Sequence, residues 1–232
     1  MIADWTSYQL ADFVPYGPEV YLRLIARVGE SYWPLHGLML LAGLALLILA
    51  VRGRGRIACL LLAGAWAWVG WGFFLQHYAE LNVAGRSLGG AFFAQALLLL
   101  LIAGIGGPAV VRPASPVIRM AAGLLALGGL LAYPLIGLYL GDSRFQAETF
   151  GLHPDPTVVV TLGIALLALR GPTLLVAVTL PVLWGILSGL HRQVLELALW
   201  WLPLALSLGA FVASIWTFFA DQRWSGDARQ AS

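Results

Sequence analysis

Long apolar runs separated by short polar breaks dominate this chain of 232 residues. A helix of about 20 apolar residues can cross the roughly 30 Å hydrocarbon core of a bilayer. Seven runs reach or approach that length. They predict helices over residues 33–51, 57–77, 88–111, 117–140, 156–169, 172–190 and 194–219. We therefore expect an all-α fold, a polytopic membrane helix bundle of about seven transmembrane helices that forms a single domain over residues 1–232.

The fifth run is the shortest. Residues 156–169 reach only about 20 Å at a rise of 1.5 Å per residue, which is less than the hydrocarbon core. This segment either crosses where the bilayer is thinner or belongs to a re-entrant segment with the preceding loop. The pattern leaves both alternatives open.

An amphipathic pattern precedes the first run. Apolar residues recur every three or four positions over 18–28, while Glu19, Arg23 and Arg27 share the opposite face. Aromatic residues flank this stretch on both sides. The pattern predicts an interfacial amphipathic helix, and residues 1–32 as an outer segment on the membrane surface.

Composition supports the membrane assignment. Hydrophobic residues make up 60% and charged residues 10% of the chain, whereas soluble domains carry about 25% charged residues. This excludes a soluble enzyme, a secreted domain and a disordered chain. The net charge of +2 is spread thinly, so no nucleic-acid partner is expected. The lipid bilayer is the expected partner, with other membrane proteins as further candidates.

The arginines are distributed asymmetrically. Eight of the thirteen fall in the breaks after the first, third and fifth predicted helices, close to those breaks, or in the tail at 220–232. Because positive residues mark the cytoplasmic side, this predicts an outer N-terminus and a cytoplasmic C-terminal tail. The expected location is a bacterial-type inner (plasma) membrane.

Histidines and carboxylates gather at the opposite, outer side, where all four histidines and nine of the eleven acids lie. Histidine with carboxylate is a usual ligand set for metals, and histidines at opposed helix ends can bind haem. The metal-ligand candidates are His77, Glu80, His153 and His191. Histidines that merely avoid hydrocarbon would produce the same pattern.

The longest polar connection, residues 141–157, ends in Asp155-Pro156-Thr157. An acid followed by proline is a typical helix start, so Asp155 is predicted as the N-cap of the short fifth helix. That helix would point its positive end at the loop. We expect this cap to lie below the outer surface and to close the bundle.

No predicted span carries an ionisable residue at its middle. Ion-coupled carriers usually place such groups near the midplane. The pattern therefore argues against a carrier that is proton-coupled or takes a charged substrate.

Several stretches resemble one known family. They are residues 66–71, 76–82, 92–95, 150–151, 154–157, 183–184 and 188–189. They are similar to the domain-of-unknown-function family 6064, small bacterial inner-membrane proteins sometimes labelled permeases. The resemblance implies a multi-helix membrane fold without an established activity, so it supplies no catalytic residue.

Our first hypothesis is a small permease-like or ligand-binding protein with an outward-facing polar pocket. The residues expected to line that pocket are His36, Gln76, His77, Glu80, Asn82, Gln95, His153, Asp155 and His191. Two alternatives stay open: a metal- or haem-binding membrane oxidoreductase, and a structural or assembly subunit of a membrane complex. The sequence itself requires no cofactor, and it favours a protein that is not an enzyme.

Overall fold

The structure, a computed structural model, describes residues 14–105, 115–141 and 143–230, without the side chains of residues 105 and 223–230. Every regular element in these ranges is helical. The elements are α1 (Pro18–Ser31), α2 (Leu35–Val51), α3 (Gly55–Val69), η3 (Gly70–Tyr78), α4 (Ala79–Leu81), α5 (Ala84–Ile105), α6 (Pro116–Leu127), η4 (Gly128–Ala132), α7 (Tyr133–Leu140), η5 (Arg144–Gln146), α8 (Pro154–Ala168), α9 (Gly171–Val194) and α10 (Trp201–Gln230).

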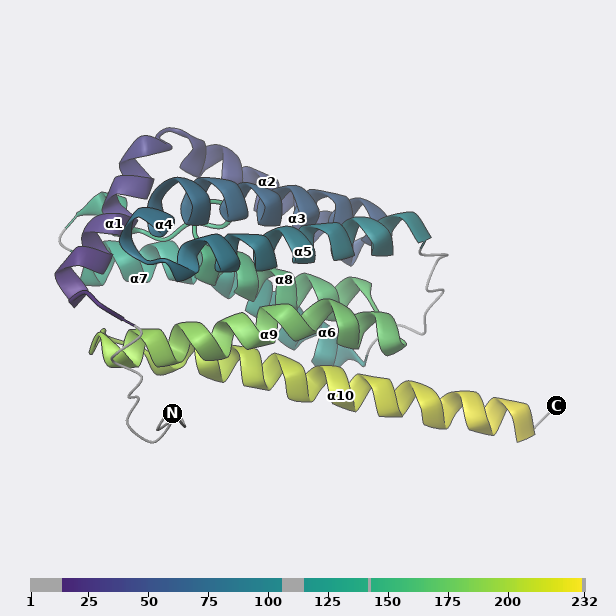
Figure 1. Cartoon of the computed structure of the whole chain (residues 1–232). Helices are drawn as coiled ribbons and strands as arrows, with labels where there is room; N and C mark the ends of the chain where they lie inside the picture. The colour runs from purple at the N-terminus through teal and green to yellow at the C-terminus, as the bar shows by residue number, and fades with distance from the viewer. Residues whose placement is uncertain (1–13, 106–114, 142, 231–232) are drawn as a thin grey trace, which may run out of the picture.

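Most helices run side by side along one axis and form a bundle (Figure 1). Five of them are long and apolar enough to cross a membrane. These are Gly55–Leu81, Ala84–Gly104, Pro116–Leu140, Gly171–Val194 and Trp201–Gln222. The predicted helical bundle is confirmed, while α2 and α8 are shorter than these five, so a count of seven crossings stays a prediction.

Several predicted boundaries are wrong, among them three at the last two helices. The penultimate helix, α9, continues to Val194, and the last helix, α10, begins only at Trp201. Helix α10 then continues to Gln230, so most of the segment expected as a tail is helical. Residues 220–230 contain no proline, and nothing in their sequence forces a helix to stop there. The predicted helix residues 106–111, together with Arg112, lie outside the described residues.

Helix α8 is the centre of the bundle. Every residue from Pro154 to Leu166 is buried, and the helix contacts α2, α3, α6, α9 and α10. It runs from the end where α1 lies to the end where α9 begins (Figure 1). Because protein surrounds it, its 15 residues do not have to match the thickness of the hydrocarbon. This explains the short fifth run.

Helix α1 has the predicted amphipathic pattern, but its apolar face meets protein. Ile25 and Val28 are almost completely buried, while Arg23 and Arg27 are exposed. The helix packs on η3 and on η5, whose Phe145 carbonyl lies where a side chain at Gly29 would have to be. Helix α1 therefore covers one end of the bundle with its apolar face, and its position at the membrane surface stays a prediction.

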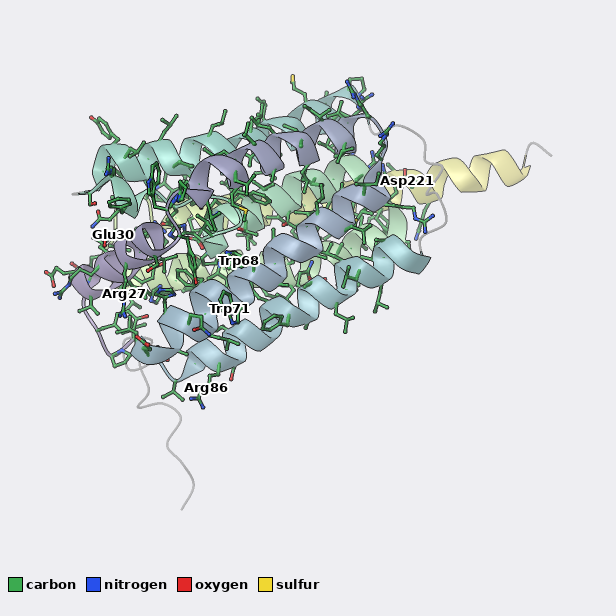
Figure 2. All side chains as sticks on the ribbon, turned by 90° about the horizontal axis from the view of Figure 1, so that it is seen from above. Arg27, Glu30, Trp68, Trp71, Arg86 and Asp221 are labelled. Atoms are coloured by element: carbon green, nitrogen blue, oxygen red, sulfur yellow. The ribbon has the colours of Figure 1, made fainter. Side chains whose placement is uncertain are left out.

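The two ends of the bundle differ in charge. We call them the α1 end, with α1 and residues 143–153, and the arginine end, where α2 ends and α3, α6 and α9 begin (Figure 1). By their positions at these helix ends, the arginine end carries Arg52, Arg54, Arg56, Arg119 and Arg170. Figure 2 shows Arg27, Glu30 and Arg86 at one end and Asp221 at the other. Exposed apolar side chains lie on the helices between them, among them Leu41, Leu124, Leu183, Val212 and Trp216.

The segment η3 is a π-helix, in which the chain forms a wider turn than in an α-helix. The carbonyl of Gly72 accepts hydrogen bonds from the Tyr32 hydroxyl at 3.2 Å and from His77 Nδ1 at 2.7 Å. A side chain at Gly72 would collide with that hydroxyl. This turn places Phe73 and Tyr78, both buried, at the wall of a pocket.

Candidate functional site

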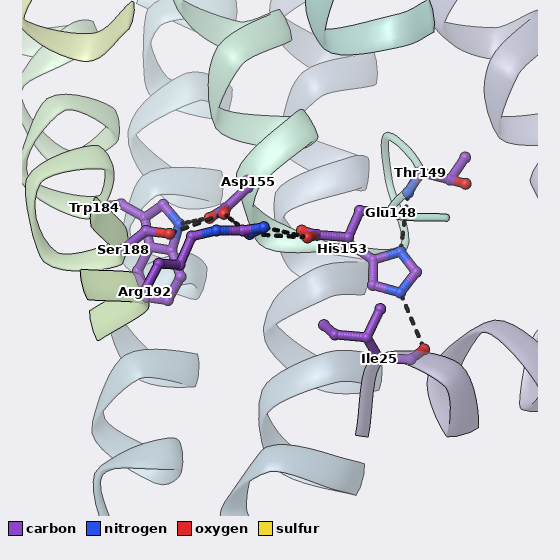
Figure 3. Close-up of polar contacts among 8 residues, drawn as sticks. All are labelled: Ile25, Glu148, Thr149, His153, Asp155, Trp184, Ser188 and Arg192. Carbon is purple, nitrogen blue, oxygen red and sulfur yellow. Dashed lines mark hydrogen bonds and ion pairs between the residues drawn. The ribbon is translucent and has the colours of Figure 1, made fainter. Parts of the chain in front are cut away.

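A buried group of charged residues lies near the α1 end (Figure 3). Arg192 of α9 donates from Nη1 to Glu148 Oε1 at 2.9 Å and to Asp155 Oδ2 at 3.0 Å. Its Nη2 also donates to Glu148 Oε1, at 3.1 Å. One guanidinium therefore binds two carboxylates, one from the segment before α8 and one from α8 itself. We call these three residues the ion cluster.

Both oxygens of Asp155 are used. Trp184 Nε1 donates to Oδ1 at 2.9 Å, and the Ser188 hydroxyl donates to Oδ2 at 2.8 Å, beside Arg192. Trp184, Ser188 and Arg192 are spaced by four residues, so they lie on one face of α9. The carboxylate thus joins the central helix to three successive turns of α9.

The prediction that Asp155 is the N-cap of α8 is wrong. His153 occupies the N-cap position without a capping hydrogen bond from its side chain, and Asp155 lies in the first turn. Two prolines near the start of the helix remove backbone donors that a cap would satisfy. The Asp155 side chain turns toward α9 instead, and its charge still lies at the favourable positive end of α8.

Hydrogen bonds to the backbone fix the segment that carries Glu148. The Thr157 hydroxyl accepts from the Gly151 amide at 2.8 Å and donates to the His153 carbonyl at 2.7 Å. The Thr149 amide donates to His153 Nδ1 at 3.0 Å. Gly151 has φ +76°, a left-handed conformation that glycine adopts without strain. As expected, this segment is buried and closes the bundle.

Both ring nitrogens of His153 contact the backbone, so this residue has a structural role. Its Nε2 faces the Ile25 carbonyl of α1 at 3.5 Å (Figure 3), and its Nδ1 already accepts from the backbone. Burial lowers the pKa of the ring to about 4, although these backbone contacts partly oppose the shift. The ring is therefore neutral at physiological pH, and both nitrogens serve to hold α1 and the segment 147–153 together.

A pocket of about 280 Å³ opens beside the ion cluster, between α1, η3, α5 and α9. We call it the aromatic pocket. Its lining is mainly apolar and aromatic, and its polar side chains come mostly from α9 and from Asn82, which follows α4. The lining residues are Val14, Tyr21, Phe73, Tyr78, Asn82, Ala84, Leu88, Trp184, Leu187, Ser188, Leu190, His191 and Val194. At its edge the Tyr16 hydroxyl lies 2.7 Å from that of Tyr78 and 2.9 Å from His191 Nε2.

A second cavity of about 140 Å³ is lined by Glu148 and Arg192 of the ion cluster, and we call it the Glu148 cavity. Tyr133 of α7 and the connection between α9 and α10 complete it. Ser188 lines the aromatic pocket and Arg192 lines the Glu148 cavity, yet both bind the same Asp155 oxygen. The ion cluster therefore lies between the two cavities.

Of the predicted pocket residues, the structure brings three together. Asn82 and His191 line the aromatic pocket, and Asp155 lies directly behind Trp184 and Ser188 in its wall. The resulting pocket is more apolar than the polar one we expected, because aromatic side chains supply most of its surface.

The other predicted residues do not join this pocket. His36 lies beside Trp33, and Gln76 is exposed. Glu80 pairs with Arg27 at 3.4 Å on the surface. His77 contacts the Gly72 carbonyl, and Gln95 donates to the Ala177 carbonyl between α5 and α9 at 2.9 Å. His153 is held by the backbone, as described above.

The metal-ligand candidates are also dispersed. Within the ranges that the structure describes, no three histidine, cysteine or carboxylate side chains are close enough to hold a metal ion. Each of the four candidates has a different set of neighbours; they are His77, Glu80, His153 and His191. The described part of the chain therefore offers no metal site of three such ligands to the oxidoreductase alternative.

Sequence reasoning did not select Arg192 or Glu148 as site residues. A signal was present, because Trp184, Ser188 and Arg192 follow one another at intervals of four and form a polar line on an apolar helix. Glu148 carried no comparable signal, since its position depends on how the segment before α8 folds back into the bundle.

The fold is an apolar helical bundle of the kind that crosses membranes, with a buried ion cluster between two cavities near one end. The chain belongs to the family of unknown function DUF6064, which it matches over residues 18–223. The match includes every residue of the ion cluster. No curated protein and no solved structure matches the chain.

Proposed function

We propose that this membrane protein binds a small, neutral, mainly apolar molecule with a hydrogen-bonding group in the aromatic pocket. The observation that carries the proposal is the composition of that pocket. Tyr21, Phe73, Tyr78 and Trp184 offer flat apolar surface, and Ser188 is one of its few polar groups. Ligand sites typically combine apolar and aromatic walls with a small number of placed polar groups.

The electrostatics favour a neutral ligand. Arg192 and Asp155 lie behind the pocket wall and are already paired with each other. The polar side chains that reach the pocket, Asn82, Ser188 and His191, are hydrogen-bonding groups rather than permanent charges. A charged ligand would have to give up its hydration without gaining a compensating charge in the pocket.

The packing of α8 supports binding over an open channel. This helix fills the middle of the bundle and is buried along nearly its whole length. A permease-like activity would require α9 to move relative to α8, which would disturb the hydrogen bonds of Asp155. Binding requires no such movement.

We further propose that the chain crosses a bacterial inner membrane seven times, with the α1 end outside. The concentration of arginines at the arginine end supports this orientation, since basic residues mark the cytoplasmic side. The aromatic pocket would then face the outer leaflet, where apolar and amphipathic molecules are available.

The proposal is tested with full-length protein purified in a mild neutral detergent. Native mass spectrometry and solvent extraction should reveal a small molecule bound at one per chain. If none co-purifies, 2-naphthol, a flat neutral molecule with one hydroxyl, is the probe. The variant Ala84→Trp places a large side chain in the pocket lining and should remove the bound molecule or probe.

The matched control is Val83→Trp. Val83 is the neighbouring residue, is 92% exposed and does not line the pocket, so this variant should bind as the unmodified protein does. Binding that survives Ala84→Trp, or that is lost equally in both variants, would contradict the assignment of the pocket.

A further inference from the structure

The charges of the ion cluster do not balance. Two buried carboxylates, Glu148 and Asp155, share the single guanidinium of Arg192. With both acids ionised the cluster carries one uncompensated negative charge. An unpaired charge in a low-dielectric interior is costly, so a positive ion or a proton is required to neutralise it.

The buried polar atoms of the cluster that lack a hydrogen-bond partner among the described residues, Arg192 Nε and Glu148 Oε2, belong to residues that line the Glu148 cavity. Asp155 uses both of its oxygens, whereas Glu148 Oε2 has no hydrogen-bond partner within the part of the chain that the structure describes. The Tyr133 hydroxyl is also buried without a partner, and both residues line the Glu148 cavity. Glu148 is 7% exposed and Tyr133 is 6% exposed, so bulk solvent does not supply the missing hydrogen bonds of these two residues. Buried polar groups without a partner are rare in proteins and indicate a missing ligand, ion or water.

We propose that the Glu148 cavity is a binding site for a small monovalent cation, which the Glu148 carboxylate and the Tyr133 hydroxyl hold in exchange for a proton. In this exchange a cation replaces the carboxyl proton of Glu148, and the proton leaves to water. The inference does not depend on the aromatic pocket, which lies on the other side of the cluster.

The size and charge of the site select this class of ligand. A volume of about 140 Å³ accommodates a small ion with several waters, because one water needs only about 10–15 Å³ on this measure. One positive charge makes the cluster neutral. A divalent ion would leave an excess positive charge, and it normally binds to more oxygen ligands than the cavity provides.

Proton exchange follows from the surroundings of Glu148. Arg192 faces it from α9, Asp155 from α8, Tyr133 from α7, and Tyr21 lies nearby on α1. Burial raises the pKa of Glu148 to about 7, the charge of Arg192 opposes this shift, and Asp155 adds to it. The tyrosines stay neutral near pH 7, since their ordinary pKa is about 10. A proton and a small monovalent cation therefore compete for Glu148 near neutral pH.

The first test measures the melting temperature of full-length protein in neutral detergent. NaCl, KCl or methylammonium chloride is titrated while N-methyl-D-glucamine chloride, a bulky cation, keeps the ionic strength constant. At least one small cation should raise the melting temperature in a saturable way. Half-saturation should need about tenfold more cation at pH 6 than at pH 8, because protonation of Glu148 removes the binding form.

The variants separate the site from general salt effects. Glu148→Gln should abolish the response, whereas Glu80→Gln, which removes an exposed carboxylate at the same end, should retain it. Tyr133→Phe removes only the hydroxyl and should weaken binding severalfold, so it tests the site even if Glu148→Gln fails to fold.

A second measurement detects the exchange directly. Addition of the effective cation to weakly buffered protein at pH 7 should release about half a proton per chain. The proposal is overturned if no small cation stabilises the protein beyond N-methyl-D-glucamine. It is also overturned if Tyr133→Phe and Glu148→Gln respond like the unmodified protein, or if cation binding releases no proton.

Discussion

Two arginines at the α1 end, Arg192 and Arg27, both pair with carboxylates, and they show how much the surroundings of a residue matter. The side chain of Arg192 is 15% exposed, and the side chains of its partners Glu148 and Asp155 are 9% and 1% exposed. Arg27 and Glu80 form a similar contact but are 66% and 63% exposed. Water screens the surface pair and makes its net contribution small. The buried pairs cannot be broken without leaving a charge in the interior.

This difference gives a prediction at the residue scale. Arg192→Gln should lower the free energy of unfolding by about 3–5 kcal/mol, because two carboxylates lose the guanidinium that pairs with both of them. Arg27→Gln, the matched control, should change it by less than about 1 kcal/mol. Chemical denaturation of the two variants in the same detergent provides the measurement. Equal, small effects would mean that water reaches the cluster.

At the scale of the element, the contact between α6 and α8 explains how a helix can be buried on every side. Gly163 of α8 lies against the backbone of Ala122 and Ala126, and a Cβ atom there would come within 2.6 Å of backbone atoms of α6. Gly123, on α6, has nothing within 4 Å of such an atom. Small residues at a helix contact let the two backbones approach closely, which is a common means of packing in membranes.

The two glycines therefore predict opposite responses to the same change. Gly163→Ala should destabilise the protein by about 1–3 kcal/mol, because α6 and α8 have to move apart. Gly123→Ala should be neutral or slightly stabilising, since alanine is the better helix former and meets open space. Thermal unfolding of the two variants in parallel tests this, and a loss of stability in Gly123→Ala alone would contradict the described packing.

At the scale of the whole molecule, the bundle has two chemically different ends. The arginine end satisfies helix ends with guanidinium groups, as when Arg56 donates to the Ala103 carbonyl at 2.9 Å. Arg170 does the same for the carbonyls of Leu166 and Leu169. The α1 end instead holds the ion cluster and both cavities, so the orientation of the protein decides which compartment reaches them.

The proposed orientation predicts the result of reporter fusions. A fluorescent protein fused after Ser232 should fold in the cytoplasm and fluoresce. Alkaline phosphatase inserted after Asn82, at the α1 end, should be active outside the inner membrane. The reverse result for both reporters would place the two cavities on the cytoplasmic side. The physical basis is the preference of basic residues for the cytoplasmic side.

Local pattern alone was enough to predict much of this structure. The chain has too few charged residues to shield its long apolar runs from water. In a bilayer each run forms an α-helix, because an α-helix satisfies its own backbone hydrogen bonds. The amphipathic face of α1 and the grouping of Arg52, Arg54, Arg56, Arg119 and Arg170 at one end follow from spacing and order along the chain. Asp155 was also identified as an important residue, although for the wrong reason.

The site itself was decided by tertiary structure. Glu148 and Arg192 are 44 residues apart, and only the return of the segment 147–153 into the bundle brings them together. The fold also gives both nitrogens of His153 backbone partners, so they are not free to bind a ligand. His77 and Glu80 contact other groups, away from the ion cluster. Sequence determines which side chains sit on which helix face. The contacts between faces depend on how closely the helices pack. At Gly163 and Gly29 the close approach is possible because glycine has no Cβ atom.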